Sequence, residues 1–237
     1  MLTISDDTSA GQTKASLLML QIREGIMDGR HLLDSPLREE ALEQAYGTSR
    51  GPVREALRAL EMRGLVTHRE RRGFRVRSYS RKSVADLYRL RSVLERMSVE
   101  ALAGLEQEPL EALIRKLQAS NQQMRQHLAE GRTGLYLQEN VVFHQHIVRA
   151  CDNEVLERSL MVLNETAEPL RHALLRKKGS TATAHLEHQK ITAHIESRNF
   201  HAAAAVTESH VLENLPKVMA VLDDLIPRRP AGEGADD

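Results

Sequence analysis

The feature that most restricts the fold is a stretch from residue 83 to residue 223 that has the pattern of helix almost throughout. Apolar residues recur there at helical spacing, and the break of note runs from Gly131 to Gly134. Antiparallel helices of such lengths form a bundle with an interior that can hold a ligand. The sequence therefore predicts about six helices, at residues 83–103, 107–129, 134–151, 154–176, 181–197 and 199–223.

The composition supports a mainly α protein with two domains. The chain has 237 residues, 3% aromatic residues and no Trp, whereas strand-rich folds usually hold more aromatic and β-branched residues. We expect an N-terminal domain at residues 1–80, the all-helical domain at 81–226, and a disordered tail at 227–237.

Cysteine use and hydropathy indicate the compartment. Cys151 is the single cysteine, so no internal disulfide can form and a reducing compartment is expected. No charged-then-apolar leader opens the chain, and no apolar run approaches the roughly 18 residues that span a bilayer. We therefore expect a cytoplasmic protein without a membrane partner.

The net charge is formally zero, but the charges are unevenly distributed. Residues 50–82 contain eleven Lys and Arg residues and three Glu residues. A concentrated basic segment on an otherwise acidic chain is typical of a protein that binds a polyanion. A solvated charged surface would have the same composition, so charge alone leaves both interpretations open.

The N-terminal region has the pattern of a helix-turn-helix. Apolar spacing predicts helices at 14–28, 37–46 and 50–63. Ser49 is a suitable N-cap for the last of these, and Pro52 falls in its first turn, where no backbone N–H is needed.

The last of these helices has a basic ridge. Arg50, Arg54 and Arg58 recur every four residues, about 100° from the apolar side. An arginine can donate two hydrogen bonds to guanine and can also pair with phosphate. The N-terminal part of the helix is therefore expected to enter the major groove of DNA.

A β-hairpin is predicted after the basic helix. Residues 65–68 and 74–77 read as strands around a turn at residues 70–73. Arg72 and Gly73 lie at the tip of this hairpin, where they suit contact with the sugar-phosphate backbone. The hairpin is interpreted as the wing of a winged helix-turn-helix.

The residues from Gly47 to Leu57, GTSRGPVREAL, with Leu60-Glu61 and then Gly64-Leu65-Val66, closely resemble the GntR family of bacterial regulators over about residues 12–78. The resemblance implies a homodimer that binds a palindromic operator in double-stranded DNA, often as a repressor associated with the nucleoid. Some relatives use a further arginine two or three residues before the central leucine of the first helix of the motif; here Glu40 occupies the closest position and Arg38 lies two residues earlier. The predicted DNA-binding residues are Arg38, Ser49, Arg50, Pro52, Arg54, Arg58, Arg72 and Gly73.

Eleven histidines are many for this length, and some could meet in the helical domain. Asn140 and His144 are four residues apart on one predicted helix, and His188 and His210 lie on two others. Three imidazoles and one side-chain oxygen could hold a divalent metal ion. Scattered histidines on amphipathic helices are more often surface or core residues. Four of them, His146, His172, His194 and His201, have that character, whereas His185 remains a possible substitute ligand.

The spacing of these residues also resembles the FadR-type C-terminal domain, FCD, over about residues 84–222. The segment from Leu87 to Glu95 is similar to the first helix of that domain. The resemblance implies the metal ligands Asn140, His144, His188 and His210, with zinc or nickel as the divalent transition metal.

Asn140 stands where the resemblance more commonly has Asp. Three neutral imidazoles and a neutral amide would leave the charge of the ion uncompensated by the protein, so a small carboxylate effector is expected to bind there. Arg91 borders an apolar stripe and, as the resemblance implies, could bind that carboxylate. The alternative for Arg91 is an ordinary ion pair with Glu95 at i,i+4.

Two other functions are alternatives to effector-controlled transcription. A hydrolytic enzyme would need a general base beside the metal, but Glu187 and Glu139 each adjoin a ligand in sequence and point about 100° away from it. The other alternative is a DNA-binding dimer whose metal is structural or absent. The prediction is a transcription regulator, not an enzyme, whose operator affinity is controlled by an organic acid at the metal site.

Overall fold

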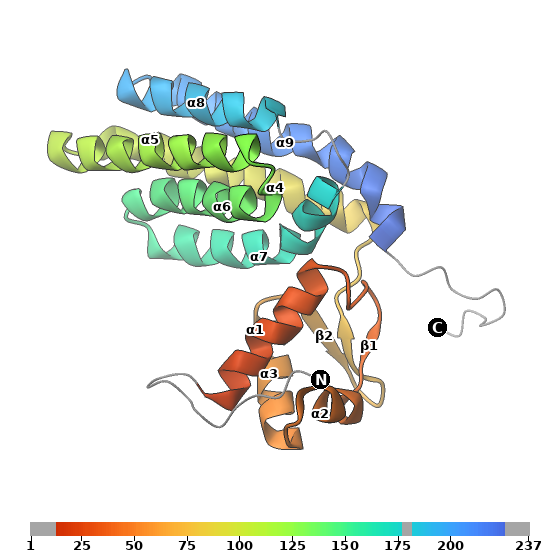
Figure 1. Ribbon diagram of the computed structural model, residues 1–237. Helices are drawn as coiled ribbons and strands as arrows, with labels where there is room; N and C mark the ends of the chain where they lie inside the picture. The colour runs from red at the N-terminus through yellow and green to blue at the C-terminus, as the bar shows by residue number, and fades with distance from the viewer. Residues whose placement is uncertain (1–12, 177–181, 226–237) are drawn as a thin grey trace. The chain divides into compact units, whose positions relative to one another are not determined.

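The computed structural model describes residues 13–176 and 182–225, which form two compact units, one of residues up to Ser80 together with those from Val221 onward, and one of Arg81–Ala220 (Figure 1). The architecture is mainly α, as predicted. The expected disordered tail at 227–237 lies outside the described residues.

The first unit contains three helices and a small antiparallel sheet of strand order β1-β3-β2. The predicted helix-turn-helix and wing are both present. The elements are α1 (Lys14–Met27), β1 (Pro36–Leu37), α2 (Glu39–Tyr46), α3 (Arg50–Met62), β2 (Val66–Arg69) and β3 (Gly73–Val76).

Strand β1 corrects the predicted start of the second helix. Pro36 and Leu37 pair with Arg75 and Phe74 of β3, so α2 begins at Glu39 rather than at residue 37. Leu37 is buried, but it lies on a strand of the sheet and not on a helix face. A strand of two residues is too short to show the alternation by which strands are recognised.

Helix α1 packs on α3 and holds the unit together. Leu18 and Ile22 of α1 and Val53, Leu57 and Leu60 of α3 are fully buried. The turn between α2 and α3 depends on Gly47, whose φ of 60° lies in the left-handed region that other residues enter only at a cost. This turn directs the start of α3 away from the core.

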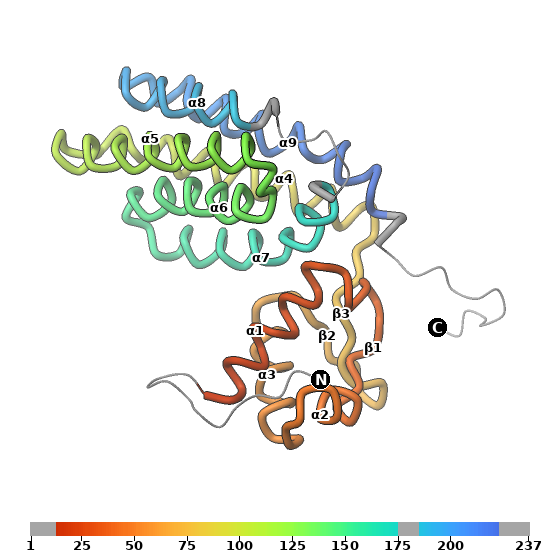
Figure 2. The backbone as a smooth tube through the Cα atoms, in the orientation of Figure 1, coloured from red at the N-terminus to blue at the C-terminus, as the bar shows by residue number. Residues whose placement is uncertain are grey.

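The second unit is a six-helix bundle within the described residues, and its helices agree closely with the predicted ranges. The backbone trace shows α5 lying along α8 and α6 along α7 (Figure 2). Phe143, Leu117, Met124 and Ile191 lie in its core. The elements are α4 (Arg81–Ala101), a short 3₁₀ helix (Leu102–Gly104), α5 (Gln107–Ala129), α6 (Thr133–Ala150), α7 (Glu154–Arg176), α8 (Ala182–Glu196) and α9 (Phe200–Leu225).

Buried polar contacts hold α8 in register against α5. Asn121 donates from Nδ2 to Thr192 Oγ1 over 2.8 Å, and Thr192 Oγ1 donates to the backbone carbonyl of His188 over 3.0 Å. His188, one turn before Thr192 on the same helix, is fully buried. Among the described residues, no helix is long and apolar enough to span a membrane.

Candidate nucleic-acid interface and candidate metal centre

The arginine ridge of α3 lies on the solvent side of the first unit. Val53, Leu57 and the other apolar residues of α3 face inward, whereas the arginine side chains remain about half to two-thirds exposed. The exposed fractions are 68% for Arg50, 53% for Arg54 and 52% for Arg58.

Glu39, at the start of α2, holds two of these arginines. Arg50 Nε donates to Glu39 Oε2 over 2.6 Å, and Arg54 Nε lies 3.4 Å from Glu39 Oε1. The hydrogen bond to Glu39 raises the pKa of Arg50. Sequence reasoning did not identify Glu39, because its contact with α3 depends on how the turn at Gly47 folds the two helices together.

Arg58 connects α3 to the wing. Its Nη1 lies 2.7 Å from Glu61 Oε2, and its guanidinium carbon lies 5.3 Å from the centre of the Phe74 ring. Of the three arginines on the ridge, Arg58 is therefore the one that contacts the hairpin.

The wing tip and the start of α3 border one cleft of about 720 Å³. Arg71 and Gly73 take left-handed φ angles of 61° and 71°, which leaves Arg72 exposed at the tip between them. The cleft brings together three of the predicted DNA-binding arginines with three glutamates. Its charged lining residues are Arg38, Arg50, Arg72, Arg75, Glu39, Glu40 and Glu43.

Ser49 and Pro52 lie at the start of α3. Ser49 is exposed and has the extended backbone of an N-cap, but its side chain makes no capping hydrogen bond. Its hydroxyl is therefore free of a structural role in the cap. Pro52 is half-buried in the first turn, as expected.

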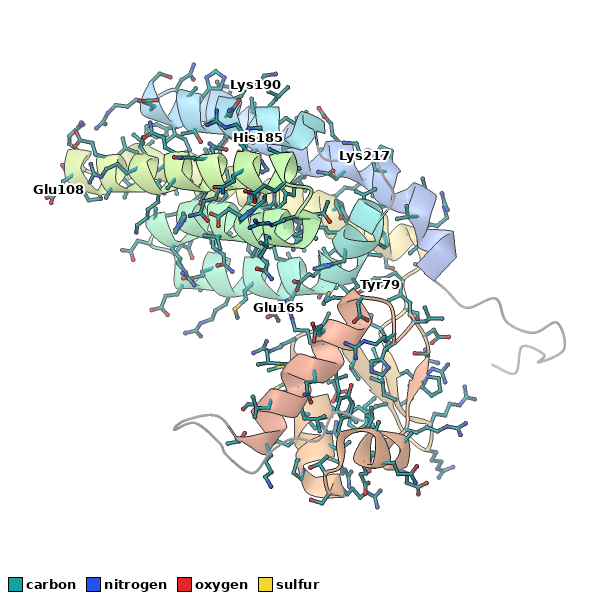
Figure 3. The ribbon with its side chains drawn as sticks, viewed as in Figure 1. Tyr79, Glu108, Glu165, His185, Lys190 and Lys217 are labelled. Atoms are coloured by element: carbon teal, nitrogen blue, oxygen red, sulfur yellow. The ribbon has the colours of Figure 1, made fainter. Side chains whose placement is uncertain are left out.

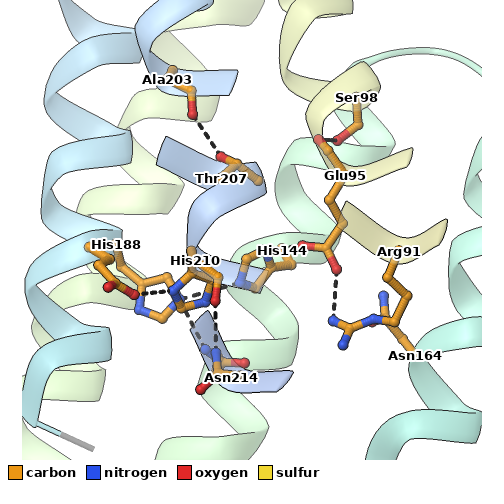
Figure 4. Close-up of polar contacts among 12 residues, drawn as sticks. Arg91, Glu95, Ser98, His144, Asn164, His188, Ala203, Thr207, His210 and Asn214 are labelled. Atoms are coloured by element: carbon orange, nitrogen blue, oxygen red, sulfur yellow. Dashed lines mark hydrogen bonds and ion pairs between the residues drawn. The ribbon is translucent and has the colours of Figure 1, made fainter. Parts of the chain in front are cut away.

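The second unit brings three predicted histidines together in its interior. His144 of α6, His188 of α8 and His210 of α9 each offer a ring nitrogen, and these atoms lie within 4.8 Å of one another (Figure 4). These residues are 7%, 0% and 5% exposed, respectively. The rings of His144 and His210 stack with their centres 5.4 Å apart.

Asn140 lies beside the three histidines, one helical turn before His144. Its amide Nδ2 is 3.0 Å from His188 Nε2. A half-turn of the amide would present Oδ1 at the same place, because the two amide atoms are nearly equal in shape. Three imidazole nitrogens and an amide oxygen suit a divalent transition metal such as zinc or nickel.

Two carboxylates each contact the Nδ1 atom of one histidine, on the side of the ring away from the centre. Glu95 Oε2 lies 3.0 Å from His144 Nδ1, and Glu187 Oε2 lies 2.5 Å from His210 Nδ1. Carboxylates in such positions turn the other ring nitrogen toward the centre and fix its orientation. The expectation that the protein supplies no compensating charge is therefore wrong, because two glutamates adjoin the centre.

The electrostatics of the centre follow from burial and these contacts. Burial raises the pKa of Glu95, but the charges of His144 and Arg91 outweigh burial and hold that pKa well below its usual value. The hydrogen bond with His210 lowers the pKa of Glu187. Burial and the neighbouring histidines hold the pKa of His188 well below its ordinary value, so its ring stays neutral and able to bind a metal.

Arg91 forms the ion pair that was the alternative to ligand binding. Its Nη2 donates to Glu95 Oε1 over 2.7 Å, and its Nε donates to Asn164 Oδ1 over 2.8 Å. Arg91 is only 4% exposed. Its carboxylate-binding role stays a prediction.

His185, labelled in Figure 3, lies one turn before His188 on α8 and does not join the three-histidine cluster. It is buried, and its Nδ1 has no hydrogen-bond partner among the described residues. Sequence reasoning named Glu95 only as an ion-pair partner of Arg91 and rejected Glu187 as a general base, so it missed their contacts with His144 and His210. The i+4 spacing from Arg91 was a signal for Glu95, but nothing in the sequence connects Glu187 to His210.

Comparison with known proteins gives matches over both units. Residues 15–76 match the bacterial regulatory proteins of the gntR family, and residues 86–213 match the FCD domain. The chain is 26% identical over 205 residues to the uncharacterised HTH-type transcriptional regulator YdhC of Bacillus subtilis, covering 86% of this chain and 90% of that protein.

A second relative is named as a probable D-xylose utilization operon transcriptional repressor of Paenarthrobacter nicotinovorans. It is 30% identical over 158 residues, covering 65% of this chain and 68% of that protein. The gluconate operon transcriptional repressor of Bacillus subtilis is 28% identical over 149 residues, covering 63% and 58%. Among solved structures, McbR/YncC of E. coli has the same fold, with a TM-score of 0.72 at 17% identity over 89% of this chain and 99% of that one.

Proposed function

Because this chain belongs to the GntR family of bacterial regulatory proteins and carries an FCD domain, we propose that it is a repressor whose affinity for a palindromic operator is set by a small carboxylate effector. Members of this family are DNA-binding transcription regulators and not enzymes. The observation that carries the effector part of the proposal is the buried cluster of His144, His188 and His210.

The DNA-binding part rests on the basic surface of the first unit. Arg50 and Arg54 begin the exposed side of α3, where side chains of a recognition helix reach base edges. Arg72 at the wing tip and the hydroxyl of Ser49 suit phosphate contacts. Two relatives are named as operon repressors, which supports repression as the mode of regulation.

The metal would be held by Asn140, His144, His188 and His210. When bound, the ion would supply a positive centre that attracts a carboxylate oxygen. The residues of the chain itself orient this centre: Glu95 and Glu187 direct two imidazoles inward, and the bundle core around Phe143 excludes water. An acid that binds one arrangement of the bundle better than another changes operator affinity by that difference in binding.

A homodimer is supported by exposed apolar side chains on α4 and α7. Leu90, Val93 and Met97 form one stripe along α4 and are each about half exposed, at 49%, 53% and 49%. A second copy of the chain would cover such a stripe. A two-fold dimer would place two α3 helices about 34 Å apart, one turn of DNA, which explains a palindromic operator.

One observation favours the alternative in which the metal is only structural. Glu95 contacts both His144 and Arg91, so the residues around the centre already form a closed network of charges. In that case the metal would stabilise the fold, and organic acids would not change DNA binding.

The test compares purified protein with chelator, with zinc, and with zinc plus organic acids. An operator is first selected from random duplex DNA, and operator affinity and melting temperature are then measured in each condition. His210→Ala should remove the zinc and acid responses, whereas His201→Ala, which changes an exposed residue of the same helix, should keep them. A melting temperature that responds to zinc, with an operator affinity that responds to no acid, would support the structural alternative.

A further inference from the structure

The first two turns of α2 place three glutamates beside the start of α3. Glu39 and Glu40 lie in the first turn, and Glu43 follows one turn later. All three line the cleft of about 720 Å³ that Arg50 of α3 and Arg72 of the wing tip also border. Because phosphates repel carboxylates, an acidic lining is unexpected on a surface that binds DNA.

Glu39 is explained by its contacts within the first unit. Its two carboxylate oxygens lie 2.6 Å from Arg50 Nε and 3.4 Å from Arg54 Nε, and its side chain is only 19% exposed. The two terminal nitrogens of Arg50, Nη1 and Nη2, make no hydrogen bond within the part of the chain that the structure describes. They form the fork that can donate two hydrogen bonds to guanine, so Glu39 positions this arginine for base contact.

Glu40 has no such explanation. It is exposed, and its carboxylate makes no hydrogen bond or ion pair with any residue in 13–176 or 182–225. It lies near Arg50, because the pKa of Arg50 is raised first by the hydrogen bond and charge of Glu39 and then by the charges of Glu43 and Glu40. An acidic residue in the first turn also stabilises a helix, and that is the alternative to a role in DNA recognition.

A carboxylate discriminates between base edges because it can only accept hydrogen bonds. In the major groove, guanine and thymine present acceptor atoms, which repel a carboxylate. Adenine presents its amine beside the acceptor N7, whereas cytosine presents the N4 amine alone. Cytosine is therefore the base that suits Glu40 best.

We propose that Glu40 determines part of the operator sequence by accepting a hydrogen bond from N4 of a cytosine, close to the guanine that Arg50 contacts. This proposal rests on the proposed function, because it takes the cleft between α3 and the wing as the DNA-binding face. A base without an amine at that position would leave the carboxylate unpaired and facing an acceptor. Glu40 therefore also acts against incorrect operators.

The test selects operators from a random duplex library with the full-length protein and two variants of Glu40. The wild-type selection should contain a cytosine at a fixed position of each half-site, and changing that base pair should weaken binding about tenfold. Glu40→Ala should lose the preference at that position alone. Glu40→Gln should change the preference to adenine, because a glutamine amide can accept from N6 and donate to N7.

Two further variants separate base recognition from net charge. Glu43→Gln removes the same charge from the same cleft, so it should tighten binding to all duplexes alike and keep the wild-type base preference. Glu24→Gln is the matched control outside the cleft, because Glu24 lies on α1 with its side chain 75% exposed. It should change neither affinity nor preference.

Melting temperatures separate recognition from the stability of α2. If Glu40 acts only on the helix, Glu40→Gln lowers the melting temperature and leaves the selected sequence unchanged, which overturns the proposal. The proposal is also overturned if no selected cytosine depends on Glu40. It is equally overturned if Glu40→Gln and Glu43→Gln tighten binding to all duplexes by the same factor, as the loss of repulsion alone would do.

Arg50→Ala distinguishes failure of this proposal from failure of the proposed function. If Arg50→Ala relaxes the sequence preference while Glu40→Ala changes nothing, α3 contacts the operator and only the role of Glu40 is wrong. If neither substitution changes the selected sequence, the cleft is not the DNA-binding face and both proposals fail. Loss of a different base preference in each variant supports both.

Discussion

Replacement of Glu187 by glutamine should weaken zinc binding while changing the metal-free protein little. Glu187 Oε2 lies 2.5 Å from His210 Nδ1, where it would orient a proposed ligand without itself binding the metal. Loss of such a carboxylate typically lowers metal affinity about 10- to 100-fold, or about 1.4–2.7 kcal/mol. At a fixed saturating zinc concentration, the free energy of unfolding falls by the same amount, which lowers the melting temperature by roughly 3–11 °C.

The assay is zinc competition against a chromophoric chelator, together with calorimetric melting at fixed free zinc. Without zinc the loss should stay below about 1 kcal/mol, because the Glu187 side chain is partly exposed to solvent. The control is Glu196→Gln, which makes the same substitution on the exposed side of α8. Equal zinc affinity of the two variants, or an equal loss of stability with and without zinc, would refute this account of Glu187.

Three further predictions concern DNA binding and pH. Arg50→Ala should weaken binding to a selected operator about 10- to 100-fold and relax its sequence preference, whereas Arg72→Ala should weaken binding to all duplexes alike; an Arg50→Ala protein with unchanged preference would contradict the assignment. Glu39→Gln should free Arg50 and Arg54, so that binding to random duplex DNA tightens. The slope of log affinity against log salt concentration should steepen by the equivalent of roughly one to two phosphate contacts; an unchanged slope would argue against this role. Metal-free protein should lose stability as the pH falls below about 6.5, because burial lowers the pKa of His144 and His188 and the unfolded chain takes up protons first; urea unfolding at pH 7.5 and 5.5 measures this, and equal stabilities would contradict it.

The helices could be predicted because apolar residues at helical spacing mark the buried face of each helix within its own segment of the sequence. In α3, Val53, Ala56, Leu57 and Leu60 recur at helical spacing, and all are buried in the structure. Strand β1 could not be predicted, because its two residues pair with a strand that lies far along the chain. Local periodicity carries no information about such a pairing.

The candidate metal centre could likewise be predicted only in part. Asn140 and His144 could be paired by their spacing on one helix, and the family resemblance connected them to His188 and His210. The contact between Glu187 and His210 depends on how α8 crosses α9, which no spacing within either helix specifies.

The three histidines come from α6, α8 and α9, so the cluster does not exist until α9 has docked. During synthesis, a nascent chain that lacks α9 presents at most two of these imidazoles and would hold the ion weakly. Metal uptake would then mark chains that have completed their folding. A shortage of metal in the cell would first affect newly made regulator, while molecules already loaded would keep their ion.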